Sequence, residues 1–325
     1  MTTEQSSAPT TTRRHKVGVV GAGAVGSAVC YATMLRGVAD EVALYDIATA
    51  KVNAEVADIS HGAPFAPTSV ITGGDDPAVL ADSEVVVITA GAAQKPGQTR
   101  LELAGSNVRI LSALLPQIQA VAPDALLVLV TNPVDVLTYV AQRITGLPAH
   151  RVIGSGTLLD TARLQYAIAT AAGVHPSSVN AQILGEHGDS EFAAWSSGLI
   201  GPTPVREWPS AENPMFTEDA LKKIEHGVMN AAYEVINGKG ATNYGIGVSA
   251  ARLIEAILKD QQVVLPVSTV QSGVLGLNDV ALSLPSIVGA NGVTQVLTPR
   301  LDEAEIARLH ASAEALRATA ASLNL

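Results

Sequence analysis

The chain has 325 residues, of which 15% are charged and 3% aromatic, and a net charge of −10, and its length predicts about two domains. Such an acidic chain argues against nucleic-acid binding, which needs a basic face, and no apolar run approaches the ~20 residues that span a bilayer. The start of the chain lacks the apolar segment of a secretory signal, and the single cysteine, Cys30, excludes an intramolecular disulfide, so we expect a soluble cytoplasmic protein.

In the first half of the chain, short apolar runs alternate with segments of helical period. Because these runs are apolar throughout, they are typical of strands buried on both faces of a parallel sheet. Crossover helices between such strands give a doubly wound α/β domain, which we predict over residues 16–155, after a disordered tail at residues 1–15. The runs span residues 16–20, 41–46, 69–72, 84–90, 125–131 and 151–154.

The pattern changes after about residue 156. Long segments of helical period now alternate with strand-like pieces, several of which end at Gly or Asn turns. This mixture predicts an α+β second domain over residues 156–325. The helical segments cover residues 157–172, 218–238, 245–260 and 302–322, and the strand-like pieces cover 179–184, 262–271, 280–284 and 293–298.

A glycine motif directly follows the first predicted strand. Gly21, Gly23 and Gly26 have the spacing G-x-G-x-x-G, and Asp46 ends the second strand 20 positions after the last of them. This context predicts a Rossmann-type dinucleotide site, with the pyrophosphate at a helix N-terminus and the ribose on the carboxylate. Because no Arg follows Asp46, NAD is favoured over NADP. The alternative is a plain glycine-rich turn with an exposed acid.

Two further motifs carry polar side chains with two interpretations each. Asn132, in Thr-Asn-Pro after the fifth strand, either binds a ligand at the edge of the sheet or makes an ordinary Asn-Pro turn. Asp160 and Arg163 lie three residues apart on one helix face. They form either an intrahelical salt bridge or two groups that each bind a partner outside the helix.

His187 lies between glycines and acids in Leu-Gly-Glu-His-Gly-Asp, directly after a strand-like piece. A lone histidine is usually structural or solvated, and we interpret the other six histidines in that way. The strand-end position makes His187 the candidate for catalysis. Its acidic neighbours would also suit a metal, but no His-x-x-x-His pair or Cys/His cluster accompanies them, so no metal is predicted.

In their order along the chain, these motifs resemble the L-lactate/malate dehydrogenase superfamily, and within it the bacterial L-lactate dehydrogenases. The resemblance runs from about Lys16 to the C-terminus. It implies reversible hydride transfer between NADH and pyruvate, giving L-lactate, with a catalytic domain after the NAD-binding one. The motifs are GAGAVG, Asp46, AGAAQKPGQTRLEL, TNPVDVLTYV, GSGTLLDTAR, LGEHGDSE and KGATNYGIG.

The resemblance also implies roles for the site residues. His187 would exchange a proton with the substrate oxygen, and Asp160 would bind the far ring nitrogen, which gives Asp160 a partner other than Arg163. Arg163 would bind the substrate carboxylate, with Asn132 and Thr242 beside the substrate. The residues implied for cofactor binding are Gly21, Gly23, Val25, Gly26, Asp46, Lys51, Gly91, Ala92, Thr131, Asn132, Ser155 and Ile246.

The segment at residues 91–103 resembles the family's mobile lid. Arg100 would enter with the lid and polarise the substrate carbonyl. Malate dehydrogenases have an Arg at the position of Gln94, because oxaloacetate brings a second carboxylate. A neutral Gln94 offers that carboxylate no counter-ion, and an unpaired buried charge costs several kcal/mol. The resemblance therefore implies pyruvate as the substrate.

One departure from the family concerns regulation. Many bacterial relatives bind fructose 1,6-bisphosphate through an Arg two residues after the carboxylate-binding Arg and a His seven residues before the catalytic one. Gln165 and Asn180 stand at these positions here, so we expect little or no activation. The family implies a homotetramer, with a dimer as the alternative.

Two other functions stay open. The chain would be a dehydrogenase for malate or a bulkier 2-hydroxy acid if the argument from Gln94 fails. It would be a non-catalytic dinucleotide-sensing module if the same fold binds the dinucleotide but catalyses no reaction. The joint presence of His187, Asp160, Arg163 and Arg100 favours an enzyme, because a sensor needs no proton donor.

Overall fold

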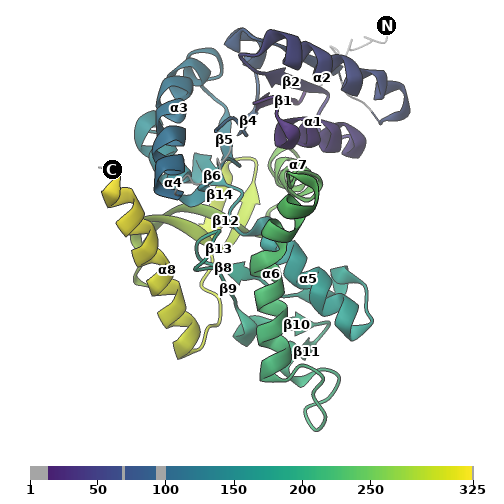
Figure 1. The fold of residues 1–325 in the computed structure, drawn as a ribbon, viewed down its shortest axis with the longest axis vertical. Helices are drawn as coiled ribbons and strands as arrows, with labels where there is room; N and C mark the ends of the chain where they lie inside the picture. The colour runs from purple at the N-terminus through teal and green to yellow at the C-terminus, as the bar shows by residue number, and fades with distance from the viewer. Residues whose placement is uncertain (1–13, 68–69, 93–99, 324–325) are drawn as a thin grey trace, which may run out of the picture.

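The structure is a computed structural model that describes residues 14–67, 70–92 and 100–323, with the side chains of residues 100 and 101 outside the description. In this part of the chain, the main sheet has nine strands in the order β14-β13-β12-β6-β5-β4-β1-β2-β3 (Figure 1). Six of them pair in parallel, as predicted. They are β1 (Lys16–Val20), β2 (Glu41–Tyr45), β3 (Val70–Gly74), β4 (Val85–Ile88), β5 (Leu126–Leu129) and β6 (Val152–Gly154).

Helices cover both faces of the parallel strands. One buried cluster joins the sheet to α1 (Ala24–Arg36) and α2 (Thr49–His61), and also contains residues of α7 (Tyr244–Leu258). A second cluster joins the opposite face to α3 (Arg100–Val121) and α4 (Val134–Thr145). Strands that are apolar throughout are therefore buried on both sides, which confirms the predicted doubly wound α/β class.

The second half of the chain continues the same sheet. Strand β12 (Val263–Ser272) runs antiparallel to β6 through Ser268 and Gly154, and β13 (Asn278–Gly289) and β14 (Gly292–Val296) follow it. Helix α7, also from the second half, packs against α1. The residues after 156 thus share a sheet and a core with the residues before it.

The rest of the second half forms a lobe below the sheet in Figure 1, with α8 (Glu303–Ser322) along one side. Its core lies between α5 (Leu158–Ala172), α6 (Glu218–Lys239) and short strands. The expected strand at 179–184 is wrong as a single element, because β7 pairs with β10 whereas β8 pairs with β9. The short strands are β7 (Val179–Asn180), β8 (Ile183–Leu184), β9 (Phe192–Ala193), β10 (Leu199–Ile200) and β11 (Thr203–Pro204), and the 3₁₀ turns are Ala63–Phe65, Pro77–Leu80, Ala149–Arg151, Pro176–Ser178, Trp195–Ser197, Val205–Glu207 and Val274–Gly276.

The start of the described chain is tied to the sheet. The backbone N–H of His15 donates to Asp40 at 2.8 Å, and its ring contacts Glu84 at 2.8 Å. The expected tail is therefore too long at His15, and its residues 1–13 lie outside the described residues. Across the described segments, every helix is too short or too polar to cross a membrane.

Candidate active site

The glycine motif forms a turn that leaves the start of α1 open. Gly21 has φ +104°, and a Cβ on it would lie 2.8 Å from the backbone nitrogen of Ala90. A Cβ on Gly26 would lie 1.8 Å from the carbonyl oxygen of Gly21, so only glycine lets α1 pack this closely on the turn. A Cβ on Gly23 would meet nothing within 4 Å. The start of α1 at its N-cap Gly23 is therefore open, which fits an anionic pyrophosphate at this helix N-terminus. Val25, in the first turn of α1, is half-buried.

Asp46 lies at the carboxyl end of β2, beside this turn. Its Oδ2 accepts the N–H of Ala22 at 2.7 Å, and its Oδ1 accepts the N–H of Ala48 at 2.9 Å. These bonds hold the carboxylate at the edge of the glycine turn, where a ribose bound to the pyrophosphate would lie. Lys51, also expected at the cofactor, is exposed in the first turn of α2.

The other expected cofactor residues follow neighbouring strands at the same edge of the sheet. Gly91 follows β4, and a Cβ on it would lie 2.3 Å from Thr131, which follows β5. Ser155 follows β6 and is buried, and Ile246 is half-buried in the first turn of α7. The carboxyl edge of a doubly wound sheet is where such folds bind dinucleotides.

Asn107 organises this edge, although sequence reasoning gave it no role. Its buried side chain accepts the N–H of Ala92 at 2.7 Å and donates to the carbonyl of Asn132 at 2.7 Å. It thereby joins the loops after β4 and β5. An amide on the apolar side of α3 was the available signal, because buried polar side chains are usually hydrogen-bonded.

Both interpretations of Asn132 find support in its geometry. Its peptide bond to Pro133 is cis, and its Oδ1 accepts the N–H of Val134 at 3.3 Å, which is ordinary turn chemistry. The side chain is also exposed at the ligand edge of the sheet. Its amide group is thus available to a ligand.

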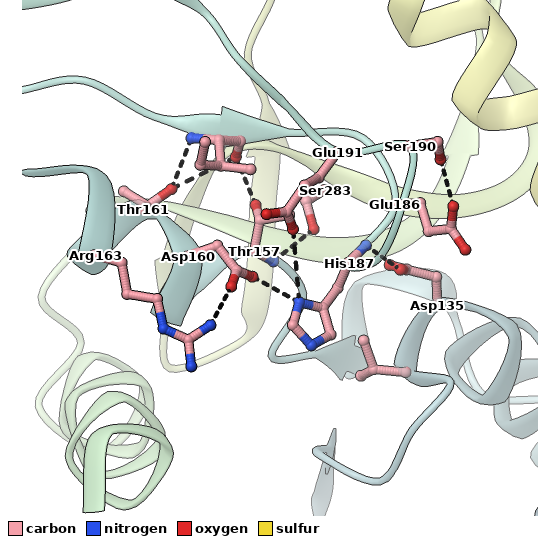
Figure 2. Close-up of polar contacts among 12 residues, drawn as sticks. Asp135, Thr157, Asp160, Thr161, Arg163, Glu186, His187, Ser190, Glu191 and Ser283 are labelled. Atoms are coloured by element: carbon pink, nitrogen blue, oxygen red, sulfur yellow. Dashed lines mark hydrogen bonds and ion pairs between the residues drawn. The ribbon is translucent and has the colours of Figure 1, made fainter. Parts of the chain in front are cut away.

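His187, Asp160 and Arg163 meet at one buried carboxylate (Figure 2). Nδ1 of His187 lies 2.6 Å from Oδ2 of Asp160, and Nη1 of Arg163 donates to Oδ1 at 2.7 Å. The expected contact between Asp160 and the histidine ring is present, and the salt bridge that was its alternative is present as well. A carboxylate has two oxygens, so the intrahelical pair and the long-range pair coexist.

Local hydrogen bonds hold the histidine loop over the start of α5. Thr157 donates its hydroxyl to the carbonyl of Ile183 at 2.6 Å and its N–H to Ser283 at 3.0 Å. Thr161 accepts the N–H of Ile183 at 2.9 Å. Gly185 then turns the chain with φ +89°. Strand β8 is thus fixed to the helix that carries Asp160, and the loop that follows presents His187 to it.

The electrostatics favour a protonated imidazole. Burial acts to lower the pKa of His187, but the nearby Asp160 carboxylate raises it to about 9. Burial acts to raise the pKa of Asp160, and the charges of His187 and Arg163 lower it below its usual range. Asp160 is therefore an ionised acceptor, so Nδ1 of the imidazole carries a hydrogen and Nε2 is the atom that gains or loses a proton.

Two buried acids near His187 were not predicted to act there. Asp135, 2% exposed, accepts the backbone N–H of His187 at 2.7 Å, and burial raises its pKa to about 6. Glu191, 3% exposed, lies 3.9 Å from Nδ1. Asp160, His187 and Glu191 together offer three atoms within 4.8 Å that would suit a metal. In this structure, Nδ1 and both oxygens of Asp160 already have partners.

The remaining expected substrate residues are less fully described. Thr242 is half-buried in the loop before α7. Arg100 begins α3, but its side chain lies outside the described residues, as does the whole of Gln94.

Two family models match the chain. The NAD-binding domain of lactate/malate dehydrogenase matches residues 15–154, and the α/β C-terminal domain of the same family matches residues 157–323. The chain belongs to the lactate/malate dehydrogenase family. This membership confirms the NAD cofactor and the Rossmann domain followed by a second α/β domain.

Individual members of the family resemble the chain over nearly its whole length. It is 50% identical over 308 residues to an L-lactate dehydrogenase of Bifidobacterium animalis subsp. lactis, covering 94% of this chain and 96% of that protein. One from Clostridium botulinum is 45% identical over 305 residues, covering 94% and 95%. The crystal structure of the ligand-bound minor L-lactate dehydrogenase of Enterococcus mundtii has a TM-score of 0.92 at 40% identity, covering 95% and 98%. The predicted resemblance and enzyme class are confirmed.

Proposed function

We propose that the chain catalyses the reversible reduction of pyruvate to L-lactate. The observation that carries this proposal is the arrangement around Asp160, whose two oxygens hold an imidazole and a guanidinium side by side. A 2-oxo acid needs a proton donor at its carbonyl oxygen and a cation at its carboxylate. His187 and Arg163 supply these two groups from adjacent positions.

In the reaction, bound NADH supplies a hydride to the carbonyl carbon. His187 donates the proton on Nε2 to the carbonyl oxygen, and takes it back when lactate is oxidised. Asp160 keeps Nδ1 protonated and stabilises the imidazolium, so the acid is present at neutral pH. Among the guanidinium nitrogens of Arg163, only Nη1 has a hydrogen-bond partner within the described residues, namely Asp160. Its other donors are available for the substrate carboxylate.

The choice of pyruvate rests on Gln94. A neutral amide at this position leaves a second substrate carboxylate without a counter-ion, whereas the methyl group of pyruvate needs none. Gln94→Arg should shift the ratio of kcat/KM values toward oxaloacetate by at least about tenfold, since a buried ion pair recovers several kcal/mol. Gln94→Lys is the matched control for charge without the bidentate geometry of Arg. An unchanged ratio in both variants would show that this position does not select the substrate.

A substrate panel tests the reaction itself. NADH oxidation is measured with pyruvate, oxaloacetate and 2-oxoisocaproate. We expect the highest kcat/KM with pyruvate. A preference for oxaloacetate would identify a malate dehydrogenase, and NADH binding without turnover of any acid would indicate a dinucleotide sensor.

We also propose that fructose 1,6-bisphosphate does not activate the enzyme. Gln165 and Asn180 bring no charge, and Nε2 of Gln165 donates to the carbonyl of Ala181 at 3.2 Å, so this side chain serves the fold. We expect the KM for pyruvate to be unchanged at micromolar sugar bisphosphate. A large decrease would contradict this part of the proposal.

We also propose a homotetramer, with a dimer as the smaller alternative. Helices α1 and α7 pack together and expose large apolar side chains, which is typical of interfaces between subunits. Light scattering of the purified protein measures the assembly directly. The exposed side chains are Tyr31 and Leu35 on α1 and Tyr244 and Val248 on α7.

A cytoplasmic location stays a prediction, which the single cysteine supports.

A further inference from the structure

A second carboxyl group approaches the imidazole at the same nitrogen as Asp160. Oε2 of Glu191 lies 3.9 Å from Nδ1 of His187, beside the 2.6 Å bond from Asp160 (Figure 2). Glu191 lies four residues after His187, at the end of the histidine loop and directly before β9. The backbone N–H of Glu191 donates to the carbonyl of Gly188 at 3.3 Å. This hydrogen bond within the loop helps to hold the carboxyl of Glu191 beside the imidazole of His187.

From this geometry we propose that Glu191 is a positioning residue of the reaction, which sets the pH at which His187 gives up its proton. The inference rests on the proposed function of His187 as the proton donor. Glu191 touches neither substrate nor cofactor in this role. It acts on the reaction only through the charge that it places beside the imidazole.

The site holds more acids than it can keep ionised. Asp135, Asp160 and Glu191 are all nearly inaccessible to solvent and surround one imidazole, with the guanidinium of Arg163 paired to Asp160. Asp160 receives two charge-assisted bonds. Glu191 lies at longer range, and burial together with the charge of Asp160 raises its pKa to about 8. Glu191 is therefore neutral at pH 7 and becomes an anion as the pH rises.

Other charged groups of the described chain face this centre from the surrounding helices. Arg308 on α8 donates to the backbone carbonyl of Glu191 at 3.3 Å, and its charge is paired at 2.6 Å with Glu225 on α6. Asp135 comes from α4, and Asp160 and Arg163 come from α5. Glu186, in the same loop as His187, points away from the ring and accepts the hydroxyl of Ser190.

The ionisation of Glu191 would extend the pH range over which His187 stays protonated and can act as the general acid. Below pH 8, Glu191 is neutral, and the imidazolium is stabilised chiefly by the charge of Asp160, with a smaller contribution from Asp135. Above pH 8 a second negative charge at 3.9 Å favours the protonated ring, and an opposite charge at this range moves a pKa by about one unit or more. His187 thus keeps its proton at an alkaline pH at which Asp160 and Asp135 without Glu191 would no longer hold it. Pyruvate reduction is maintained there as a result.

Glu191→Gln tests the proposal, because it removes the ionisable group and keeps its size. The pH dependence of kcat/KM for pyruvate is measured at saturating NADH, and that for lactate at saturating NAD. The two directions need opposite forms of the imidazole, so the alkaline fall in reduction and the rise in oxidation should both move down by about one pH unit. A structural defect would lower the two curves without moving them along the pH axis.

Glu186→Gln is the matched control. It removes one carboxyl from the same loop, and we expect both curves to stay in place. Glu191→Asp shortens the side chain by one methylene, so both pH curves should move in the same direction by a smaller amount. If Glu191→Gln does not fold, Glu191→Asp takes its place in the test. Curves that stay in place with the folded variant would overturn the role of Glu191. Wild-type protein that reduces no pyruvate at any pH would instead overturn the proposed function.

Discussion

The bond between Asp160 and His187 makes a quantitative prediction for Asp160→Asn. The pKa of His187 rises from 6.5 to about 9, chiefly because the Asp160 charge outweighs the cost of burial. A rise of this size corresponds to roughly 3 kcal/mol between the two protonation states. An amide in place of the carboxylate cannot stabilise the imidazolium. We therefore expect kcat/KM for pyruvate at pH 7 to fall by about 10²-fold.

The sign of the pH dependence follows from the same shift. In the wild-type protein, His187 is protonated below pH 9, and reduction is lost as the pH rises through that value. With Asn at position 160, the charge that contributes most to the raised pKa of His187 is gone, so reduction should be lost at a lower pH and partly recovered near pH 5. The assay is NADH oxidation from pH 5 to pH 10.

A control separates this effect from a general loss of charge. Asp279 forms an exposed ion pair with Arg143 at 2.6 Å, and Asp279→Asn should leave the profile unchanged because such pairs contribute about 1 kcal/mol or less. If Asp160→Asn keeps wild-type kcat/KM with an unmoved alkaline limb, the electrostatic role of Asp160 is refuted.

Three further substitutions test the cofactor turn, the substrate cation and the loop anchor. Gly26→Ala places a Cβ 1.8 Å from the carbonyl oxygen of Gly21, so we expect the Kd for NADH, measured by fluorescence titration, to rise at least about tenfold because α1 must shift; an unchanged Kd would argue against close packing. Arg163→Lys keeps the charge and loses the planar fork, so the KM for pyruvate should rise by about 10²-fold with a smaller change in kcat. Ser283→Ala leaves the buried N–H of Thr157 without its acceptor and should lower the free energy of unfolding in urea by about 1–3 kcal/mol.

Much of the fold could be predicted from local patterns. The six parallel strands each formed one apolar run, and the spacing from Gly26 to Asp46 reflects one strand–helix–strand unit, so both are visible without tertiary information. The addition of β12 to the edge strand β6 rests on pairing between Ser268 and Gly154, more than 100 residues apart. No periodicity within either segment encodes that pairing.

The candidate site shows a similar division. His187 and Asp160 were recognised from motifs, but no pattern along the chain indicates that one carboxylate binds both the ring and Arg163. Asn107 and Glu191 act through contacts made only after folding. In the sequence each is one polar residue among many, and only burial distinguishes them.

The most direct test of the account is a crystal structure of the protein with NADH and a non-reducible amide analogue of pyruvate. We expect Nε2 of His187 to lie within about 2.6–3.2 Å of the amide carbonyl oxygen, which stands for the keto oxygen of pyruvate, as general acid catalysis requires, and two donors of Arg163 to bind the carboxylate. A complex in which these side chains face different cavities, or in which Asp160 has left the histidine, would contradict it.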